Sequence, residues 1–301
     1  MSYTENYQKW LDFAELPAYL HDELVAMDEK TKEDAFYTNL EFGTAGMRGL
    51  IGAGTNRINI YVVRQATEGL AQLIDSKGEE AKKRGVAIAY DSRHFSPEFA
   101  FESAQVLAAH GIKSYVFESL RPTPELSFAV RHLHTFAGIM VTASHNPAPF
   151  NGYKVYGEDG GQMPPADADA LTDYIRAIEN PFTVQLADLE ESKASGLIEV
   201  IGENVDAEYL KEVKGVNINQ DLINEYGRDM KIVYTPLHGT GEMLARRALA
   251  QAGFEAVQVV EAQAVPDPDF STVKSPNPEN QEAFALAEEL GRKVDADVLV
   301  A

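Results

Sequence analysis

Short apolar runs alternate with longer amphipathic stretches along most of the chain, and this rhythm constrains the fold more than any other feature of the sequence. The apolar runs are typical of buried strands and lie at 86–90, 113–117, 136–142, 231–235, 257–260 and 298–301. Segments typical of helices separate most of them, at 96–110, 124–132, 242–251 and 278–290. Strands that alternate with helices form right-handed βαβ units. We therefore predict an α/β fold with mixed, mostly parallel sheets.

The length and the layout together predict two consecutive α/β domains. The 301 residues have room for roughly two domains of ordinary size. The stretch at 180–203 reads as a connector with one strand inside it, so we place the boundary near residue 200 and expect domains at 1–200 and 201–301. The final apolar run stops without a following surface loop, and we therefore expect the second domain to be truncated.

Charge and composition exclude several classes of function. The formal net charge of -21 repels nucleic acid and anionic lipid, so we expect neither as a partner. The chain has no cysteine, which excludes disulfides, thiolate nucleophiles and cysteine-bound zinc. The N-terminus lacks a signal-peptide pattern and no uncharged apolar stretch reaches about 18 residues, which predicts a cytoplasmic protein. The oligomeric state stays open.

Polar residues gather where predicted strands end. The triplet Asp-Ser-Arg at 91–93 and the segment Thr-Ala-Ser-His-Asn-Pro at 142–147 each follow a strand directly. A glycine-rich segment at 42–49 contains Arg48, and Lys154 comes shortly after the second cluster. Ligands of open α/β sheets bind beyond the carboxyl ends of the strands, and Arg, Lys and backbone N–H groups are donors that hold phosphate. The sequence therefore predicts a site for a phosphate monoester at the carboxyl ends of these strands.

Each of these features also has a purely structural interpretation. A glycine-rich octad can be a tight turn, and Asp-Ser-Arg can be an ion pair at the start of a helix. Lys154 can be a solvated lysine of an edge strand. His145 is adjacent to Ser144, but neighbours in an extended chain point to opposite sides. The pair therefore does not predict a serine-hydrolase dyad, and the sequence has no Gly-x-Ser-x-Gly elbow around Ser144.

Several segments, in order along the chain, resemble one known family. The hexapeptide at 142–147 resembles the active-serine signature of the α-D-phosphohexomutase superfamily, which includes phosphoglucomutases and phosphomannomutases. Further segments similar to family segments lie at 42–49, 151–154, 235–241, 266–270 and 276–279. The context of Ala143 and of residues 153–156 is more similar to glucomutases or phosphopentomutases than to hexosamine mutases. The chain as a whole most resembles bacterial phosphoglucomutases, with phosphomannomutases and phosphopentomutases as alternatives.

This resemblance implies a role for each candidate residue. Ser144 would be a phosphoserine that exchanges its phosphoryl group with a sugar monophosphate, through glucose 1,6-bisphosphate in a glucose enzyme. Lys154 and His145 would handle protons and stabilise charge, without a firm division between them. The residues that would bind phosphate or substrate are Thr44, Gly46, Arg48, Arg93 and Asn146.

The resemblance also implies a magnesium ion, held between the serine phosphate and an Asp-x-Asp-x-Asp-Arg loop. The sequence contains no such loop, because Asp267 and Asp269 stand between prolines and resemble another segment, and Asp295 and Asp297 precede a strand. We therefore expect Ser144 to contribute through its phosphate and the carboxylate ligands to lie beyond Ala301. The 301 residues alone are then expected to lack mutase activity. The alternative of another class is a sugar-phosphate-binding module without catalysis.

Overall fold

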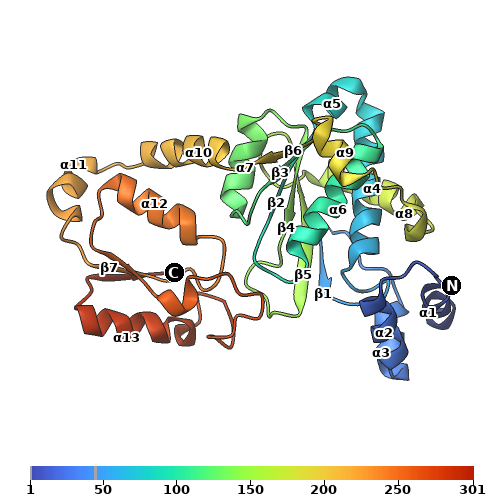
Figure 1. The fold of residues 1–301 in the computed structure, drawn as a ribbon, viewed down its shortest axis with the longest axis horizontal. Helices are drawn as coiled ribbons and strands as arrows, with labels where there is room; N and C mark the ends of the chain where they lie inside the picture. The colour runs from blue at the N-terminus through green and yellow to red at the C-terminus, as the bar shows by residue number, and fades with distance from the viewer. Residues whose placement is uncertain (1, 44–45) are drawn as a thin grey trace.

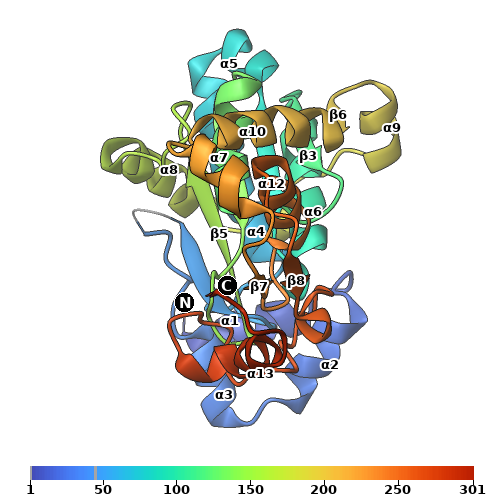
Figure 2. The same ribbon diagram turned by 90° about the vertical axis from the view of Figure 1, so that its left-hand side faces the viewer.

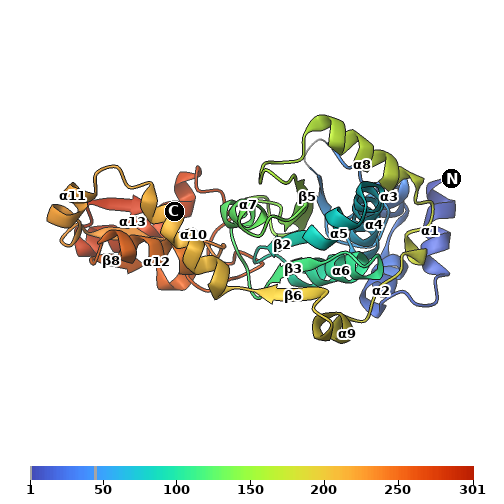
Figure 3. The same ribbon diagram turned by 90° about the horizontal axis from the view of Figure 1, so that it is seen from above.

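The computed structural model describes residues 2–43 and 46–301 and contains two α/β units side by side (Figure 1). We call residues 2–202 the N-terminal unit and residues 203–301 the C-terminal unit. Each unit has its own sheet, and Figure 3 shows the two units following one another along the long axis of the molecule. Within the described part of the chain, no helix is long and apolar enough to cross a membrane.

The N-terminal unit is built on a six-stranded sheet of order β1-β5-β4-β2-β3-β6. Its strands are β1 (Met47–Leu50), β2 (Val86–Tyr90), β3 (Ser114–Phe117), β4 (Ala137–Val141), β5 (Phe150–Tyr156) and β6 (Ile198–Ile201). β2, β3, β4 and β6 pair in parallel, whereas β5 is antiparallel to both β1 and β4. The predicted α/β fold with a mixed, mostly parallel sheet is therefore confirmed.

Helices cover both faces of this sheet because its central strands are apolar on both sides. In β2, Ile88 belongs to the core under α4 (Ile60–Lys77) and α6 (Ser96–Ala109), while Ala87 and Ala89 belong to the core under α7 (Thr123–His132). α8 (Pro165–Ala177) packs on the outer side of α4, and α5 (Glu79–Arg84) and α9 (Leu189–Ala194) complete the unit. Parallel strands buried on both faces require this three-layer arrangement.

Three short helices precede the sheet and pack against one another. They are α1 (Tyr3–Leu11), α2 (Ala18–Ala26) and α3 (Glu29–Phe36). Trp10 holds them to the unit, because its ring makes edge contacts with Phe36, Tyr61 and Phe182. Pro17 lies between α1 and α2 and caps the start of α2.

The C-terminal unit has a smaller parallel sheet of order β8-β7-β9. Its strands are β7 (Ile232–Tyr234), β8 (Val257–Val259) and β9 (Val298–Val300), and its main helices are α10 (Glu203–Gly215), α12 (Glu242–Ala252) and α13 (Ala285–Val294). A short helix, α11 (Gln220–Leu222), follows α10. α10 packs against α7 of the N-terminal unit and against α12 of its own unit, as Figure 2 shows. This helix therefore links the two units.

Some local expectations were wrong, and each has a physical reason. The end of the glycine-rich segment forms β1, which the sequence does not reveal because its partner β5 lies about a hundred residues further on. The helix expected at 278–290 begins with a 3-10 turn (Gln281–Phe284) and is helical only from Ala285, since the chain before it forms a separate turn in which the Asn280 N–H donates to the Asn277 carbonyl at 3.0 Å. The connector at 180–203 contains α9 as well as the expected strand.

Candidate active site

Ser144 lies on the loop that follows β4, and its backbone is held in an uncommon conformation. Its φ of 56° places it in the left-handed region, which costs an L-residue on the order of 1 kcal/mol. Thr142 stabilises this turn, because its hydroxyl accepts the Ser144 N–H at 2.9 Å. The Thr142 N–H donates to Gly152 of β5, so the loop starts from a fixed point of the sheet. Strained residues that are held in this way are concentrated at functional sites.

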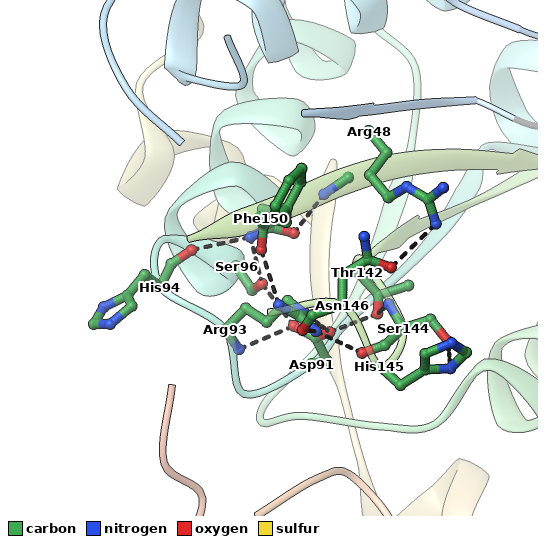
Figure 4. Close-up of polar contacts among 12 residues, drawn as sticks. Arg48, Asp91, Arg93, His94, Ser96, Thr142, Ser144, His145, Asn146 and Phe150 are labelled. Atoms are coloured by element: carbon green, nitrogen blue, oxygen red, sulfur yellow. Dashed lines mark hydrogen bonds and ion pairs between the residues drawn. The ribbon is translucent and has the colours of Figure 1, made fainter. Parts of the chain in front are cut away.

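Asp91 supports the same loop from the end of β2 (Figure 4). Its carboxylate is almost fully buried and accepts hydrogen bonds from the Thr142 hydroxyl, the Ser96 hydroxyl at 2.8 Å and the Arg93 N–H at 3.0 Å. Burial raises the pKa of Asp91, and these hydrogen bonds work against the shift. Asp91 therefore connects the ends of two neighbouring strands through Thr142, a role that sequence analysis missed because it treated Asp91 only as part of a triplet.

Arg93 lies underneath the loop and not on its rim. Its side chain is fully buried, and its two terminal nitrogens donate four hydrogen bonds to carbonyl oxygens, at distances of 2.6 to 3.0 Å. The carbonyls belong to Ser144, Asn146, Pro147 and Phe150. The expectation that Arg93 binds a phosphate directly is therefore corrected, because all four terminal N–H groups are engaged by the loop.

His145 lies closer to Ser144 than its position in the sequence implies. The Ser144 Oγ and the His145 Nδ1 are 3.3 Å apart, and both side chains are exposed to solvent. Side chains of adjacent residues diverge in an extended chain, but the left-handed turn at Ser144 brings these two together. The geometry thus allows His145 to exchange a proton with the serine oxygen.

Two cations come from the antiparallel edge of the sheet. Arg48 of β1 is opposite Gly152 of β5, so Arg48 and Lys154 point to the same face, as diagonal neighbours. Arg48 donates to the Asn146 side-chain oxygen at 3.2 Å and so reaches the serine loop. Lys154 is half-buried on β5, between β1 and β4, and is therefore not an edge-strand lysine. Burial lowers the pKa of Lys154, and the nearby positive charge of Arg48 lowers it further.

The glycine-rich segment approaches β5 very closely. Gly46 has a φ of 123°, and a Cβ atom at this position would collide with the Tyr153 carbonyl. The Gly46 N–H donates to the Gly43 carbonyl at 3.2 Å, within the turn that leads into β1. Gly46 therefore shapes the turn that positions Arg48. Thr44, the other candidate from this segment, lies outside the described residues.

A cleft of about 380 Å³ lies between the two units, beyond the ends of β2 and β4. The N-terminal unit contributes Ser92, Ser144 and His145 to its wall, and the C-terminal unit contributes Leu237 and Phe270, among others. The volume falls within the range of small-molecule sites. Ser144 thus lines an open cleft that is large enough for a sugar phosphate.

The loop after β7 repeats the construction of the Ser144 loop. The Thr235 hydroxyl accepts the Leu237 N–H at 3.1 Å, and Leu237 has a left-handed φ of 48°. Thr235 and Leu237 thus correspond to Thr142 and Ser144, but the left-handed position carries an apolar side chain. The two units share a local design of which only one copy has a hydroxyl at this position.

The described residues do not form a magnesium site on their own. Among residues 2–43 and 46–301, no group of three or more His, Asp or Glu side chains is placed to hold a metal ion. Asp267 accepts the N–H and the hydroxyl of Ser271, and Asp269 pairs with His94 at 2.7 Å. Both carboxylates of this Asp-x-Asp segment are therefore occupied by local contacts.

Comparison with known families agrees with this geometry. Residues 39–182 match the family described as "Phosphoglucomutase/phosphomannomutase, alpha/beta/alpha domain I", and residues 207–301 match its "alpha/beta/alpha domain II". The chain belongs to the phosphoglucomutase/phosphomannomutase family, within the α-D-phosphohexomutase superfamily.

Curated relatives in this family are bacterial phosphoglucomutases. The chain is 40% identical to a phosphoglucomutase of Staphylococcus epidermidis over 270 residues, which are 89% of this chain and 48% of that protein. It is 40% identical to a phosphoglucomutase of Staphylococcus haemolyticus over 288 residues, 94% of this chain and 51% of that protein. The chain thus spans about half the length of the curated relatives it matches.

Solved structures of the family share the fold. A putative phosphomannomutase from Thermus thermophilus superposes with a TM-score of 0.69 at 25% identity, over 84% of this chain and 52% of that chain. A phosphoglucomutase/phosphomannomutase family protein from Burkholderia thailandensis superposes with a TM-score of 0.63 at 22% identity, over 85% of this chain and 50% of that chain. The second likeness concerns the fold alone.

Proposed function

We propose that this chain is the phosphoserine-bearing part of a phosphoglucomutase that interconverts α-D-glucose 1-phosphate and glucose 6-phosphate. The observation that carries the proposal is the Ser144 loop, in which Thr142 and Arg93 hold an exposed serine in a strained turn that faces the cleft. The curated relatives that match this chain are named phosphoglucomutases, which favours glucose over other sugars. We also propose the N-terminal and C-terminal units as separate domains, with the boundary between β6 and α10.

In the proposed reaction, the phosphorylated side chain of Ser144 transfers its phosphoryl group to a free hydroxyl of the sugar monophosphate. The bond between phosphorus and the Ser144 Oγ breaks as the bond to the sugar oxygen forms. The sugar hydroxyl gives its proton to a general base, for which Lys154 and His145 are the candidates, and the Ser144 Oγ takes up a proton in return. The bisphosphate then turns round and returns its other phosphoryl group to Ser144. Such transfers need in-line positioning and charge neutralisation more than covalent participation of the protein.

The described side chains supply both needs. His145 lies within reach of the Ser144 Oγ and can exchange a proton with it. Burial lowers the pKa of Lys154, so Lys154 gives up a proton more readily than an exposed lysine does. Asn146 of the loop and Arg48, which are joined by a hydrogen bond, are donors for phosphate oxygens, and the turn at Gly46 positions Arg48. We assign Arg93 to the support of the loop.

Magnesium and glucose 1,6-bisphosphate belong to the proposal as the metal and the intermediate. A phosphate on Ser144 would offer one oxygen ligand to magnesium. Carboxylates of the longer chain would provide the rest, because the described residues hold no site for the metal by themselves. We further propose a sugar phosphate as the small-molecule partner and the cytoplasm as the location.

A phosphomannomutase is the second candidate, supported by the likeness to the putative phosphomannomutase of Thermus thermophilus. Rates of the full-length protein with glucose, mannose, glucosamine and ribose 1-phosphates discriminate these possibilities. A clear preference for mannose 1-phosphate would replace the glucose assignment. Binding of sugar phosphates without any turnover would favour a non-catalytic module.

The decisive experiment is phosphopeptide mapping of the full-length protein together with its Ser144→Ala variant. We expect one phosphoryl group on Ser144 and a loss of both the phosphoryl group and the mutase activity in the variant. Ser92→Ala is the matched control, because Ser92 lines the same cleft, and it should retain both. Full activity of Ser144→Ala would contradict the proposal.

A further inference from the structure

One loop of the C-terminal unit contacts Arg93, the residue that holds the Ser144 loop in place. The ring of Phe270 lies over the guanidinium group of Arg93, with the Arg93 Cζ 5.1 Å from the ring centroid. The preceding residue, Asp269, contacts His94 through Oδ1 and Nε2 at 2.7 Å. Two consecutive residues of one unit therefore touch two consecutive residues of the other.

The loop that carries Phe270 is held in shape by its own hydrogen bonds. The Asp267 carboxylate accepts the N–H groups of Asp269 and Ser271 at 3.0 and 2.9 Å, and also the Ser271 hydroxyl. Phe270 is almost fully buried and has a left-handed φ of 50°. A phenylalanine keeps such a backbone conformation only where its surroundings hold it in place.

The Phe270 ring packs against the guanidinium group of Arg93, whose planar faces cannot donate hydrogen bonds. The guanidinium is planar and donates within its plane, and its terminal donors already bind four loop carbonyls. Its faces attract aromatic rings, and this attraction is strongest where water is excluded. Because the side chain of Arg93 is fully buried, loss of the ring would expose a buried cation to a gap or to water.

We propose that Phe270 is a positioning residue for Ser144 that acts through Arg93. Phe270 of the C-terminal unit packs against this guanidinium. The guanidinium in turn binds the Ser144 carbonyl and three further carbonyl groups of the loop. Contact between the two units therefore sets the geometry of the serine. The catalytic consequence rests on the proposed mutase function, whereas the effect on the loop does not.

Hydrogen exchange of the 301-residue chain tests the structural part. In Phe270→Leu, which keeps an apolar side chain without a ring, we expect the amides of the 142–147 loop to exchange about tenfold faster. Phe270→Tyr keeps the ring and should restore slow exchange. Phe284→Leu is the matched control, because Phe284 packs in the core of the same unit, and it should leave the loop unchanged.

Equal exchange in wild type and Phe270→Leu would overturn the proposal, as would equal acceleration by Phe270→Tyr or Phe284→Leu. If Phe270→Leu does not fold, Phe270→Met decides the question, because it also removes the ring but fills more of its space. This variant should accelerate exchange of the loop about tenfold, and an unchanged loop would overturn the proposal. Asp269→Ala removes the His94 contact and leaves the ring in place, so it should leave the exchange of the loop unchanged.

Kinetics of the full-length protein test the catalytic part. Phe270→Leu should lower kcat about tenfold and leave KM for the sugar phosphate nearly unchanged, since the loop and not the sugar site is disturbed. A rise in KM at constant kcat would contradict the positioning role. Absence of turnover in the wild-type protein would instead contradict the proposed function, while the exchange result would still decide the role of Phe270.

Discussion

Thr142 offers the sharpest test of how the serine loop is stabilised. Its hydroxyl donates to the buried Asp91 carboxylate and accepts the Ser144 N–H, so Thr142→Val removes two hydrogen bonds with little change of shape. A hydrogen bond to a charged group contributes about 1.5–3 kcal/mol and a neutral one about 1 kcal/mol. We therefore expect the free energy of unfolding to fall by about 3 kcal/mol, mainly because Asp91 loses a donor while still buried.

Thr135→Val is the matched control for this prediction. Thr135 is also fully buried in the N-terminal unit, but its hydroxyl makes one neutral hydrogen bond, to the Ala137 carbonyl at 2.9 Å. Its loss should cost about 1 kcal/mol in urea unfolding at neutral pH. Equal destabilisation by the two variants would refute the idea that Asp91 and Ser144 are coupled through Thr142.

Three further predictions concern titratable groups. Hydrogen bonds to Glu68 and Asp75 raise the pKa of His110 to about 9. Protonated His110 therefore stabilises the fold fully below pH ~6.5, and this contribution is lost as pH rises through about 9. In urea unfolding, the free energy of unfolding of His110→Gln should not show this decline with pH. Burial and the neighbouring carboxylate of Asp206 raise the pKa of Glu125 from 4.5 to about 9. The free energy of unfolding of the wild type should therefore decline as pH rises between these two values, and urea unfolding of Glu125→Gln should not show this decline. In the full-length protein, Lys154→Arg keeps the charge but cannot exchange a proton, and we expect kcat to fall about 100-fold or more; a change below about threefold would exclude Lys154 from proton handling.

Local patterns predicted most of the regular structure. The strand at 86–90 was predicted with its observed limits, because five apolar residues in a row are compatible with burial on both faces of a sheet. The helix from Ser96 was predicted equally well, since the proline at its second position marks its start. Both signals lie within a few residues of the element that they specify.

The arrangement of the candidate site was predicted only in part, because it depends on long-range contacts. The sequence shows Arg93 two residues after Asp91, but it does not show that the guanidinium binds the carbonyls of Pro147 and Phe150, more than fifty residues away. The left-handed turn at Ser144, which brings His145 within reach, is likewise held by Thr142 and Arg93 and not by a glycine. The family resemblance predicted Ser144 as the reactive residue, whereas the contacts of Thr142, Asp91 and Arg93 that hold its loop were visible only in three dimensions.

The equivalence of the loops at Thr142 and Thr235 bears on the stoichiometry of the proposed enzyme. Two copies of the same turn line one cleft, and they differ in whether the left-handed residue is Ser144 or Leu237. If both turns carried a nucleophile, a bisphosphate could phosphorylate either of them. The protein would then be a mixture of molecules with different numbers and positions of phosphoryl groups. With leucine in the second copy, the proposed enzyme would carry its phosphoryl group on one of the two turns, and each proposed cycle would return the protein to a single starting form.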